Sequence, residues 1–244
     1  MSDSDQEHLI EVNGPSARSL DILARALHVK NAELQPTLEA ITSTAVRMLS
    51  PALHAGLTIF SRGELIPRAC TGEVPLVLDH LQQELGDGPC INAARCQSIF
   101  RIEDTGQDER WPQFNAEAER LNVRSMLCVP LWIDERSLGA LSLYASQVAA
   151  FTELHERVTM LLATFAALTL TEAQRASQLH EALGNRDVIG QAKGILMERH
   201  GITADTAFGV LSRVSQAENM KLVAIARHLA ETGALPGVSS SGPA

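Results

Sequence analysis

The sequence predicts an α+β domain with an antiparallel sheet flanked by helices, then a long coiled-coil-like helix, then an all-α domain of three helices. Residues 1–174 hold 13 Lys and Arg against 23 Asp and Glu, whereas residues 175–244 hold 7 against 6, so the charge changes from −10 to +1. Eight of the nine aromatic residues precede residue 175, and no proline lies between Pro130 and Pro236. The predicted boundaries are a flexible arm at 1–17, the α+β domain at 18–151, a linking and dimerisation helix at 152–183, the three-helix domain at 184–233 and a disordered tail at 234–244.

The overall composition excludes several classes of protein. None of the apolar stretches reaches the ~18 residues of a membrane span. The acidic, polar start lacks the basic and apolar segments of a secretory signal, so we expect a cytoplasmic protein. The four cysteines form no CxxC pair and no zinc spacing, which predicts reduced thiols, most of them in the core. A net charge of −9 argues against a surface generally suited to nucleic acid.

Hydrophobic periodicity places the elements of the first domain. Apolar residues recur at helical spacing in two runs from Ser19 to Leu49, and Pro36 lies near the start of the second run, where proline is tolerated. Segments rich in β-formers, separated by short turns, predict two antiparallel hairpins. The elements expected after Leu49 are strands at Ala55–Ser61, Leu65–Thr71, Gln97–Ile102, Ser125–Ile133 and Leu138–Ala145, helices at Val77–Leu85 and from Trp111 to about Leu121, and a glycine-containing loop at Leu85–Cys90.

A long helix is predicted after the last strand, with Thr152 as its N-cap. Its apolar residues repeat at steps of 4, 3, 4 and 3, which is the a/d pattern of a coiled coil. Glu172 interrupts the pattern, which then resumes. The first half can cover its own sheet or form a dimer, whereas the second half has no further sheet to cover and favours dimerisation. The apolar positions are Leu154, Val158, Leu161, Phe165, Leu168, Ala176, Leu179 and Leu183.

The last domain is predicted as three helices. The first covers Arg186–His200 and ends at Gly201, the second begins after the N-cap Thr203, and Asn219 caps the third. The expected core positions are Ile189, Ala192 and Leu196, then Ala207, Phe208, Leu211 and Val214, then Leu222, Ile225, Ala226 and Leu229.

Two groups of residues are candidates for chemistry, although the sequence holds no Ser/His/Asp signature, phosphate loop or HExxH motif and predicts no cofactor or metal. In the glycine loop, the backbone can approach a ligand closely, and Cys90 and Cys96 come within reach of each other if the loop bends. The alternative is a tight turn with small packed side chains.

In the last domain, Arg186, Lys193 and His200 are seven residues apart, so they lie on one helix face, and Arg213 and Lys221 can join them in an anionic-ligand site. The alternative is the ordinary polar edge of a surface helix.

The segment Ala182–Gly201 (ALGNRDVIGQAKGILMERHG) resembles the start of an ANTAR domain, and the resemblance continues through Ala207-Phe208, Leu211 and Asn219–Leu222. ANTAR domains are three-helix modules that bind tandem stem-loops in nascent transcripts and cause transcription antitermination. Where the family commonly has Arg after Leu211, this chain has Ser212 followed by Arg213, which bears on RNA affinity. The RNA-contact candidates are Arg186, Lys193, Arg199, Arg213, Asn219 and Lys221.

Residues 31–170 resemble a GAF sensor domain through three motifs, LGDGPC at Leu85–Cys90, DERWP at Asp108–Pro112 and VRSMLCVPL at Val123–Leu131. The combined order resembles GAF–ANTAR regulators of actinobacterial type, which implies a sensor for a small molecule or protein signal, fused to an RNA-binding output and acting as a homodimer. The ligand-binding candidates from these motifs are Gly86, Asp87, Gly88, Cys90, Trp111 and Cys128.

The resemblance implies a regulator rather than an enzyme, and three other functions stay open. One is a GAF-fold sulfoxide reductase that uses Cys90, Cys96 and Cys128. Another is a helical dimer that binds a protein partner without RNA. The third is DNA binding by a helix-turn-helix, although no second helix carries a dense polar face.

Overall fold

The structure is a computed structural model that describes residues 34–61, 64–134 and 136–236. The predicted arm at 1–17, the first helical run after Ser19, the turn at Arg62-Gly63 and the end of the tail lie outside the described residues. The chain divides into two compact units, residues 1–172 (unit 1) and 173–244 (unit 2). In the described part of the chain, no helix has both the length and the apolar character needed to cross a membrane.

Unit 1 is built on a five-stranded antiparallel sheet in the order β2-β1-β5-β4-β3. The central strands are buried on both faces, because their side chains alternate between two hydrophobic clusters. Leu127 and Leu143 face one cluster, whereas Met126 and Tyr144 face the other. The strands are β1 His54–Ser61, β2 Glu64–Cys70, β3 Phe100–Ile102, β4 Ser125–Ile133 and β5 Arg136–Ala145.

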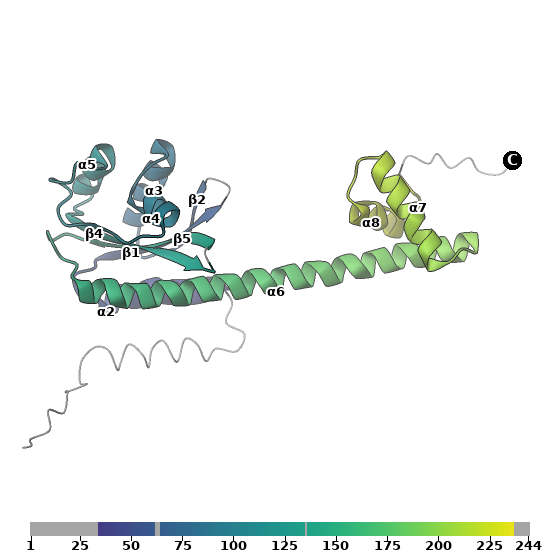
Figure 1. The fold of residues 1–244 in the computed structure, drawn as a ribbon, viewed down its shortest axis with the longest axis horizontal. Helices are drawn as coiled ribbons and strands as arrows, with labels where there is room; N and C mark the ends of the chain where they lie inside the picture. Colours follow the sequence, from purple (N-terminus) through teal and green to yellow (C-terminus); the bar gives the residue numbers. More distant parts are fainter. Residues whose placement is uncertain (1–33, 62–63, 135, 237–244) are drawn as a thin grey trace, which may run out of the picture. The chain divides into compact units, whose positions relative to one another are not determined.

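Helices cover both faces of this sheet, as Figure 1 shows. Helix α2 (Leu34–Met48) and the first part of α6 (Glu153–His200) lie on one face, where Leu38, Ile41, Leu162 and Ala166 join the first cluster. Helices α3 (Val74–Leu85), α4 (Pro89–Cys96) and α5 (Pro112–Arg120) lie on the other face. The predicted α+β fold class is confirmed.

Both predicted hairpins are present, and the differences from prediction lie in the middle of unit 1. The expected strand at Gln97–Ile102 is reduced to β3. Helix α4 occupies a segment for which no helix was predicted, because Gly-Asp-Gly-Pro is typical of a turn. Here the same residues start a helix, with Gly88 as N-cap and Pro89 in the first turn, where its missing N–H costs nothing.

Helix α6 is continuous between residues 183 and 186, where the sequence predicts a boundary between two helices. Gly184 is a weak interruption, because glycine costs only about 1 kcal/mol in a helix and no proline follows. Within unit 1, the predicted a/d positions divide between two environments. Val158 and Phe165 pack into the first cluster, whereas Leu154, Leu161 and Leu168 are exposed.

Unit 2 comprises the end of α6 with α7 (Ala204–Ala217) and α8 (Leu222–Thr232), packed around Leu196, Leu211 and Ile225. Two predicted helix ends, at Thr203 and Gly201, are confirmed. Thr203 caps α7 by accepting a hydrogen bond from the Thr206 N–H, and Gly201 and Gly233 adopt the left-handed conformation after α6 and α8.

Two predictions for unit 2 are wrong. Asn219 does not cap α8, whose N-cap is Lys221, but lies in the preceding turn with a φ of 52°. Asparagine tolerates this left-handed conformation better than most residues do. Phe208 is 46% exposed rather than part of the core, because the small Ala207 and the next-turn Leu211 occupy the buried side of α7.

Candidate functional site

A buried carboxylate lies between α3 and the sheet in unit 1. Asp79 is 2% exposed, and its carboxylate accepts hydrogen bonds from the Thr58 hydroxyl on β1 and, at 3.3 Å, from the Gln82 amide. Burial raises the pKa of Asp79 to about 6, because the charged form is removed from water, although the hydrogen bonds from Thr58 and Cys90 oppose this shift. Sequence reasoning missed this pair. Asp79 and Gln82 share the i, i+3, i+4, i+7 stripe of α3 with Pro75 and Leu78, and that spacing could have identified them.

The glycine loop is fixed to this buried pair. The Cys90 N–H donates to the Gln82 side-chain oxygen at 2.7 Å. Gly88 has a φ of 152°, and a Cβ there would lie 2.4 Å from the Gln82 side chain, so only glycine fits this close approach. Asp87 accepts from the Gly88 N–H at 2.8 Å and from the Asn92 amide at 3.0 Å, at the start of α4. The loop therefore positions α4 over the sheet.

Two of the four thiols meet on this face of the sheet. The sulfurs of Cys90 and Cys128 are 3.6 Å apart, and the Ser142 hydroxyl lies 3.1 Å from the first and 3.2 Å from the second. Cys96 is exposed at the far end of α4, so the expected approach of Cys90 to Cys96 is replaced by the pair with Cys128. Burial raises the pKa of Cys128 well above its usual value, which suppresses the reactive thiolate.

Tyr144 on β5 completes this interior group. Its ring is fully buried, and its hydroxyl has no hydrogen-bond partner among the described residues. An unpaired buried hydroxyl costs about 1–3 kcal/mol. Such a group is a natural contact point for a polar atom that enters this part of the domain.

A pocket of about 220 Å³ opens beside the glycine loop. Trp111 and Phe114 line it and also belong to the second hydrophobic cluster, which includes Cys90 and Tyr144. Asp87 and Arg110 place opposite charges on its wall, and the Arg110 guanidinium lies 4.6 Å from the Trp111 ring centroid. Two of the six predicted ligand-binding residues, Asp87 and Trp111, therefore line the pocket.

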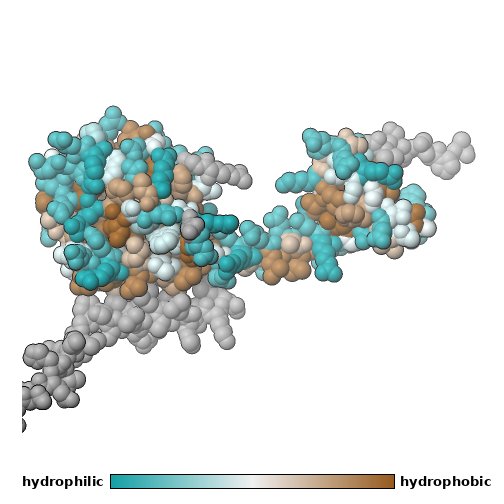
Figure 2. All heavy atoms as spheres, viewed as in Figure 1, coloured by the Kyte–Doolittle hydropathy of each residue, from teal (hydrophilic) through white to brown (hydrophobic). Residues whose placement is uncertain are grey.

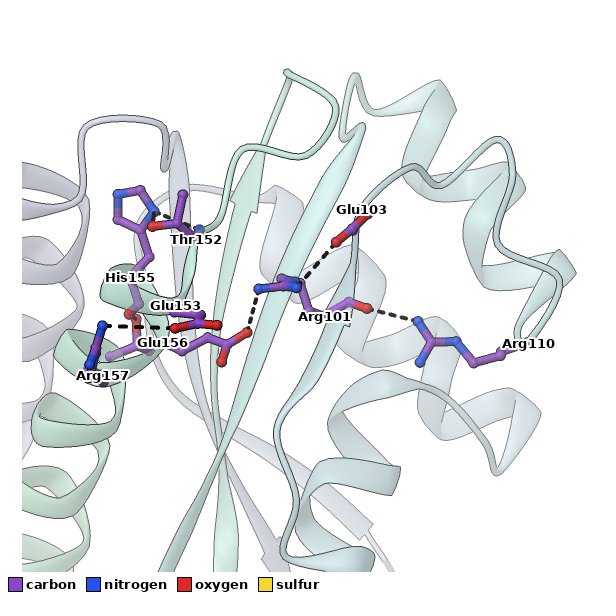
Figure 3. A network of polar contacts seen from close by, with 9 residues as sticks. Arg101, Glu103, Arg110, Thr152, Glu153, His155, Glu156 and Arg157 are labelled. Atoms are coloured by element: carbon purple, nitrogen blue, oxygen red, sulfur yellow. Dashed lines mark hydrogen bonds and ion pairs between the residues drawn. The ribbon is translucent and has the colours of Figure 1, made fainter.

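Polar contacts connect the pocket wall to the start of α6 (Figure 3). Arg110 donates to the Arg101 carbonyl on β3 at 2.9 Å, and the Arg101 guanidinium forms an ion pair with Glu156 on α6 at 2.8 Å. In the first turn of α6, the Thr152 N–H donates to His155 at 2.9 Å, which closes the N-terminus of the helix. The edge strand β3 thus connects the pocket to the long helix.

Unit 2 contains a second concavity, a groove of about 460 Å³. Arg186 and Lys193 both line it, and Asn185, Gly190 and the exposed Phe208 line it with them. Sequence reasoning placed the two basic residues on one face of the helix but missed Asn185 and Phe208. The groove is lined by Ala182, Asn185, Arg186, Ile189, Gly190, Lys193 and Phe208.

The other predicted RNA-contact residues lie away from this groove lining. The Arg199 guanidinium donates to the Gly233 carbonyl and so closes the C-terminus of α8. Arg213 is exposed on α7, and Asn219 and Lys221 are exposed in the connection between α7 and α8. The structure therefore brings Arg186 and Lys193 together at one groove and gives Arg199 an intramolecular partner.

Family comparisons agree with this division. The GAF domain family matches residues 31–171, and the ANTAR domain family matches residues 177–229. The chain belongs to the GAF–ANTAR proteins. Both domains are of regulatory type, and together they are those of a signal-responsive regulator. None of the curated proteins matches the chain.

Solved structures with a similar fold cover the GAF domain of this GAF–ANTAR protein. They include free methionine-R-sulfoxide reductase from Neisseria meningitidis in complex with its substrate, with a TM-score of 0.53 and 17% identity over 67% of this chain and 94% of that chain. The GAF domain of an Acinetobacter phosphoenolpyruvate-protein phosphotransferase has a TM-score of 0.50 and 16% identity over 65% and 95%. GAF3 from Slr1393 of Synechocystis sp. PCC6803, in its photoproduct state, has a TM-score of 0.51 and 16% identity over 60% and 99%. At these identities the likeness establishes the fold.

The raised pKa of Asp79 predicts a pH-dependent stability of the GAF domain. Between the unfolded pKa near 4 and the folded pKa of about 6, the folded state binds more protons, so stability falls as pH rises through this window. The penalty, on the order of 3 kcal/mol, is complete above the folded pKa. Asp79→Asn removes the charge but keeps an amide oxygen for the Gln82 contact and an amide N–H for the Thr58 contact. It should therefore raise the urea midpoint of unfolding at pH 7.5 and reduce the difference between the urea midpoints at pH 4.5 and pH 7.5. A variant less stable than wild type at pH 7.5 would contradict the assignment.

The burial of the thiols predicts their order of reaction. In native protein, Ellman's reagent should modify Cys96 first, because it is exposed. Cys70 should follow slowly, since burial and the nearby Asp79 raise its pKa to about 11. Cys90 and Cys128 should react only on unfolding, with Cys96→Ser as the control that removes the fast phase. Fast reaction of Cys90 or Cys128 in the folded protein would support the sulfoxide reductase alternative instead.

Proposed function

We propose that this protein is a signal-responsive RNA-binding regulator that binds tandem stem-loops in nascent transcripts and causes transcription antitermination. The observation that carries the proposal is the groove in the ANTAR domain, where Arg186 and Lys193 stand on one face of α6. Among the residues that the structure describes, neither of them forms an ion pair. Two uncompensated cations beside a concave surface suit a phosphate backbone.

In this proposal, the signal is a ligand or partner that binds the GAF domain. Two observations support binding at and near the pocket beside the glycine loop. The pocket beside the glycine loop combines an aromatic wall with the charges of Asp87 and Arg110, which is the usual composition of a small-molecule site. On the same side of the sheet, the unpaired Tyr144 hydroxyl and the buried Asp79 offer a donor and an acceptor to a ligand that reaches the interior. Cys90 and Cys128 then serve as small packed side chains in this region.

The contacts in Figure 3 offer a route from input to output. A ligand that displaces Arg110 changes the hydrogen bond to the Arg101 carbonyl and, through the Arg101 side chain, the ion pair with Glu156. Helix α6 begins three residues before Glu156 and continues into the ANTAR domain, so a change in its packing reaches the output without a separate linker. The ligand shifts the balance between the intact and the altered contacts only if it binds one of these two arrangements more tightly than the other.

Dimerisation through α6 is supported by five exposed leucines. The leucines follow one another at steps of seven, seven, eleven and four residues. At ~100° per residue, these steps keep all five within an arc of about 60°. Figure 2 shows the apolar surface, in brown, on the middle of α6. Two copies joined here can hold two RNA loops at once, so individually weak contacts give useful affinity. The leucines are Leu154, Leu161, Leu168, Leu179 and Leu183, each between 48% and 61% exposed.

The RNA proposal predicts a specific loss in Lys193→Ala. Full-length protein is incubated with a pool of tandem stem-loop RNAs with randomised loops, and an enriched RNA is titrated at two salt concentrations. Lys193→Ala should weaken binding and flatten the log–log salt slope by about 0.7 for a lost contact to single-stranded RNA. Arg227→Ala, which removes the same charge from an exposed position on α8 outside the groove, is the control. If the two variants weaken binding equally, the loss is explained by net charge and Lys193 has no specific role. If wild type enriches no RNA from the pool, RNA binding is contradicted.

The dimer proposal predicts that only one of two adjacent substitutions weakens the dimer. Leu179→Lys places a charge in the leucine stripe and should raise the dimer dissociation constant at least tenfold, or about 1.4 kcal/mol. Gln178→Lys adds the same charge about 100° away on the exposed side of α6 and should leave the constant unchanged. Sedimentation equilibrium measures both. A monomeric wild-type protein, or equal effects of the two variants, would argue against this seam.

A further inference from the structure

We propose that Phe208 is a stacking platform for one unpaired RNA base, held in the ANTAR groove between Arg186 and Lys193. This inference rests on the proposed RNA-binding function and goes beyond it, because it names the base-contacting residue and the part of the RNA that it takes. Phe208 is the only aromatic residue of the chain after Phe165.

The position of Phe208 is unusual for its domain. On α7, Ala207 and Leu211 are fully buried in the core of unit 2, whereas Phe208 is 46% exposed and lines the groove. The core around Leu196 and Ile225 is complete without it. The exposed part of the ring is therefore available to whatever occupies the groove.

The rest of the groove suits a nucleotide. Its volume of about 460 Å³ is within the ~300–1,000 Å³ of small-molecule sites. Arg186 and Lys193 are seven residues apart on α6, about 10 Å along the axis, so they can hold the phosphates on both sides of a splayed-out nucleotide. Between them, Gly190 has no side chain, and a Cβ built there would meet nothing within 4 Å, so the backbone surface is open to a ligand.

Asn185 adds the polar group that a base edge requires. It is half-buried in the same lining, and its amide has both a donor and an acceptor. Unpaired bases in RNA loops are commonly bound by stacking on an aromatic ring together with hydrogen bonds to their edges. An aromatic ring, one amide and two cations in one groove therefore favour a single-stranded nucleotide over an acidic peptide, which needs neither the flat ring nor the amide.

The test uses the full chain and the RNA that wild type enriches from the randomised tandem stem-loop pool. Phe208→Leu keeps an apolar side chain but removes the ring, and Phe208→Trp enlarges the ring. Because stacking contributes about 1–3 kcal/mol per base, Phe208→Leu should lower affinity by roughly 5- to 150-fold, whereas Phe208→Trp should retain it. Met220→Ala, at another exposed apolar position of unit 2, is the control and should bind as wild type does.

A second arm identifies the base and separates stacking from folding. Abasic substitution at each loop position should lower wild-type affinity at one position by the same factor and should have no further effect on Phe208→Leu. Circular dichroism and thermal unfolding of Phe208→Leu should match wild type. Wild-type affinity in Phe208→Leu, or additive effects of the two changes, would overturn this inference and leave RNA binding intact. Failure of wild type to enrich any RNA would overturn both proposals and favour a protein ligand for the groove.

Discussion

The alternation of side chains along β4 and β5 is the constraint on which the GAF domain depends. Because successive residues of a strand point to opposite faces, Leu127 and Leu143 must be covered from one side, and Met126 and Tyr144 from the other. Helices α2 and α6 cover the first face, the apolar face, with apolar side chains and a few buried threonines such as Thr42 and Thr159, whose hydroxyls donate to carbonyls of their own helices. Helices α3, α4 and α5 cover the second face, where Asp79, Ser142 and the hydroxyl of Tyr144 are mixed with apolar side chains. The second face, the mixed face, therefore differs from the first in holding the buried carboxylate of Asp79 and the unpaired hydroxyl of Tyr144.

This division separates the face of the sheet that holds α6 from the face that holds the buried polar groups. The apolar face fixes α6 by burying Leu162, Ala166 and Leu170, which leaves the leucine stripe of the same helix exposed. The mixed face contains a buried carboxylate and an unpaired hydroxyl, both costly in the absence of a ligand. Under the proposed function, a ligand that gives either group a partner offsets this cost. The ion pair between Arg101 and Glu156 joins the edge of the sheet to α6, so the two faces are not independent.

The ANTAR domain has a smaller core than the GAF domain. Its core is small, and Ala192, Leu196, Ala207 and Leu211 fill it, so the larger Phe208 stays at the margin beside Arg186 and Lys193. The charge of this half of the chain is close to zero, and attraction to RNA over the whole surface is correspondingly weak. The proposed recognition of RNA therefore relies on a few residues in one groove and on the proposed joining of two copies, rather than on a basic surface.

The sequence by itself determined the order of the five strands, both hairpins, the caps at Thr203 and Gly201, and the face of α6 that carries Arg186 and Lys193, because periodicity and end signals are local properties of the chain. It did not determine that α4 is a helix, that Cys90 meets Cys128 rather than Cys96, or that α6 is unbroken at Gly184. Nor did it place Phe208 outside the core or give Arg199 its partner at Gly233. These features are decided by contacts between residues distant in sequence. A pattern along one helix or strand shows which side is apolar. Only the packed structure shows which of those apolar side chains find no room in the core.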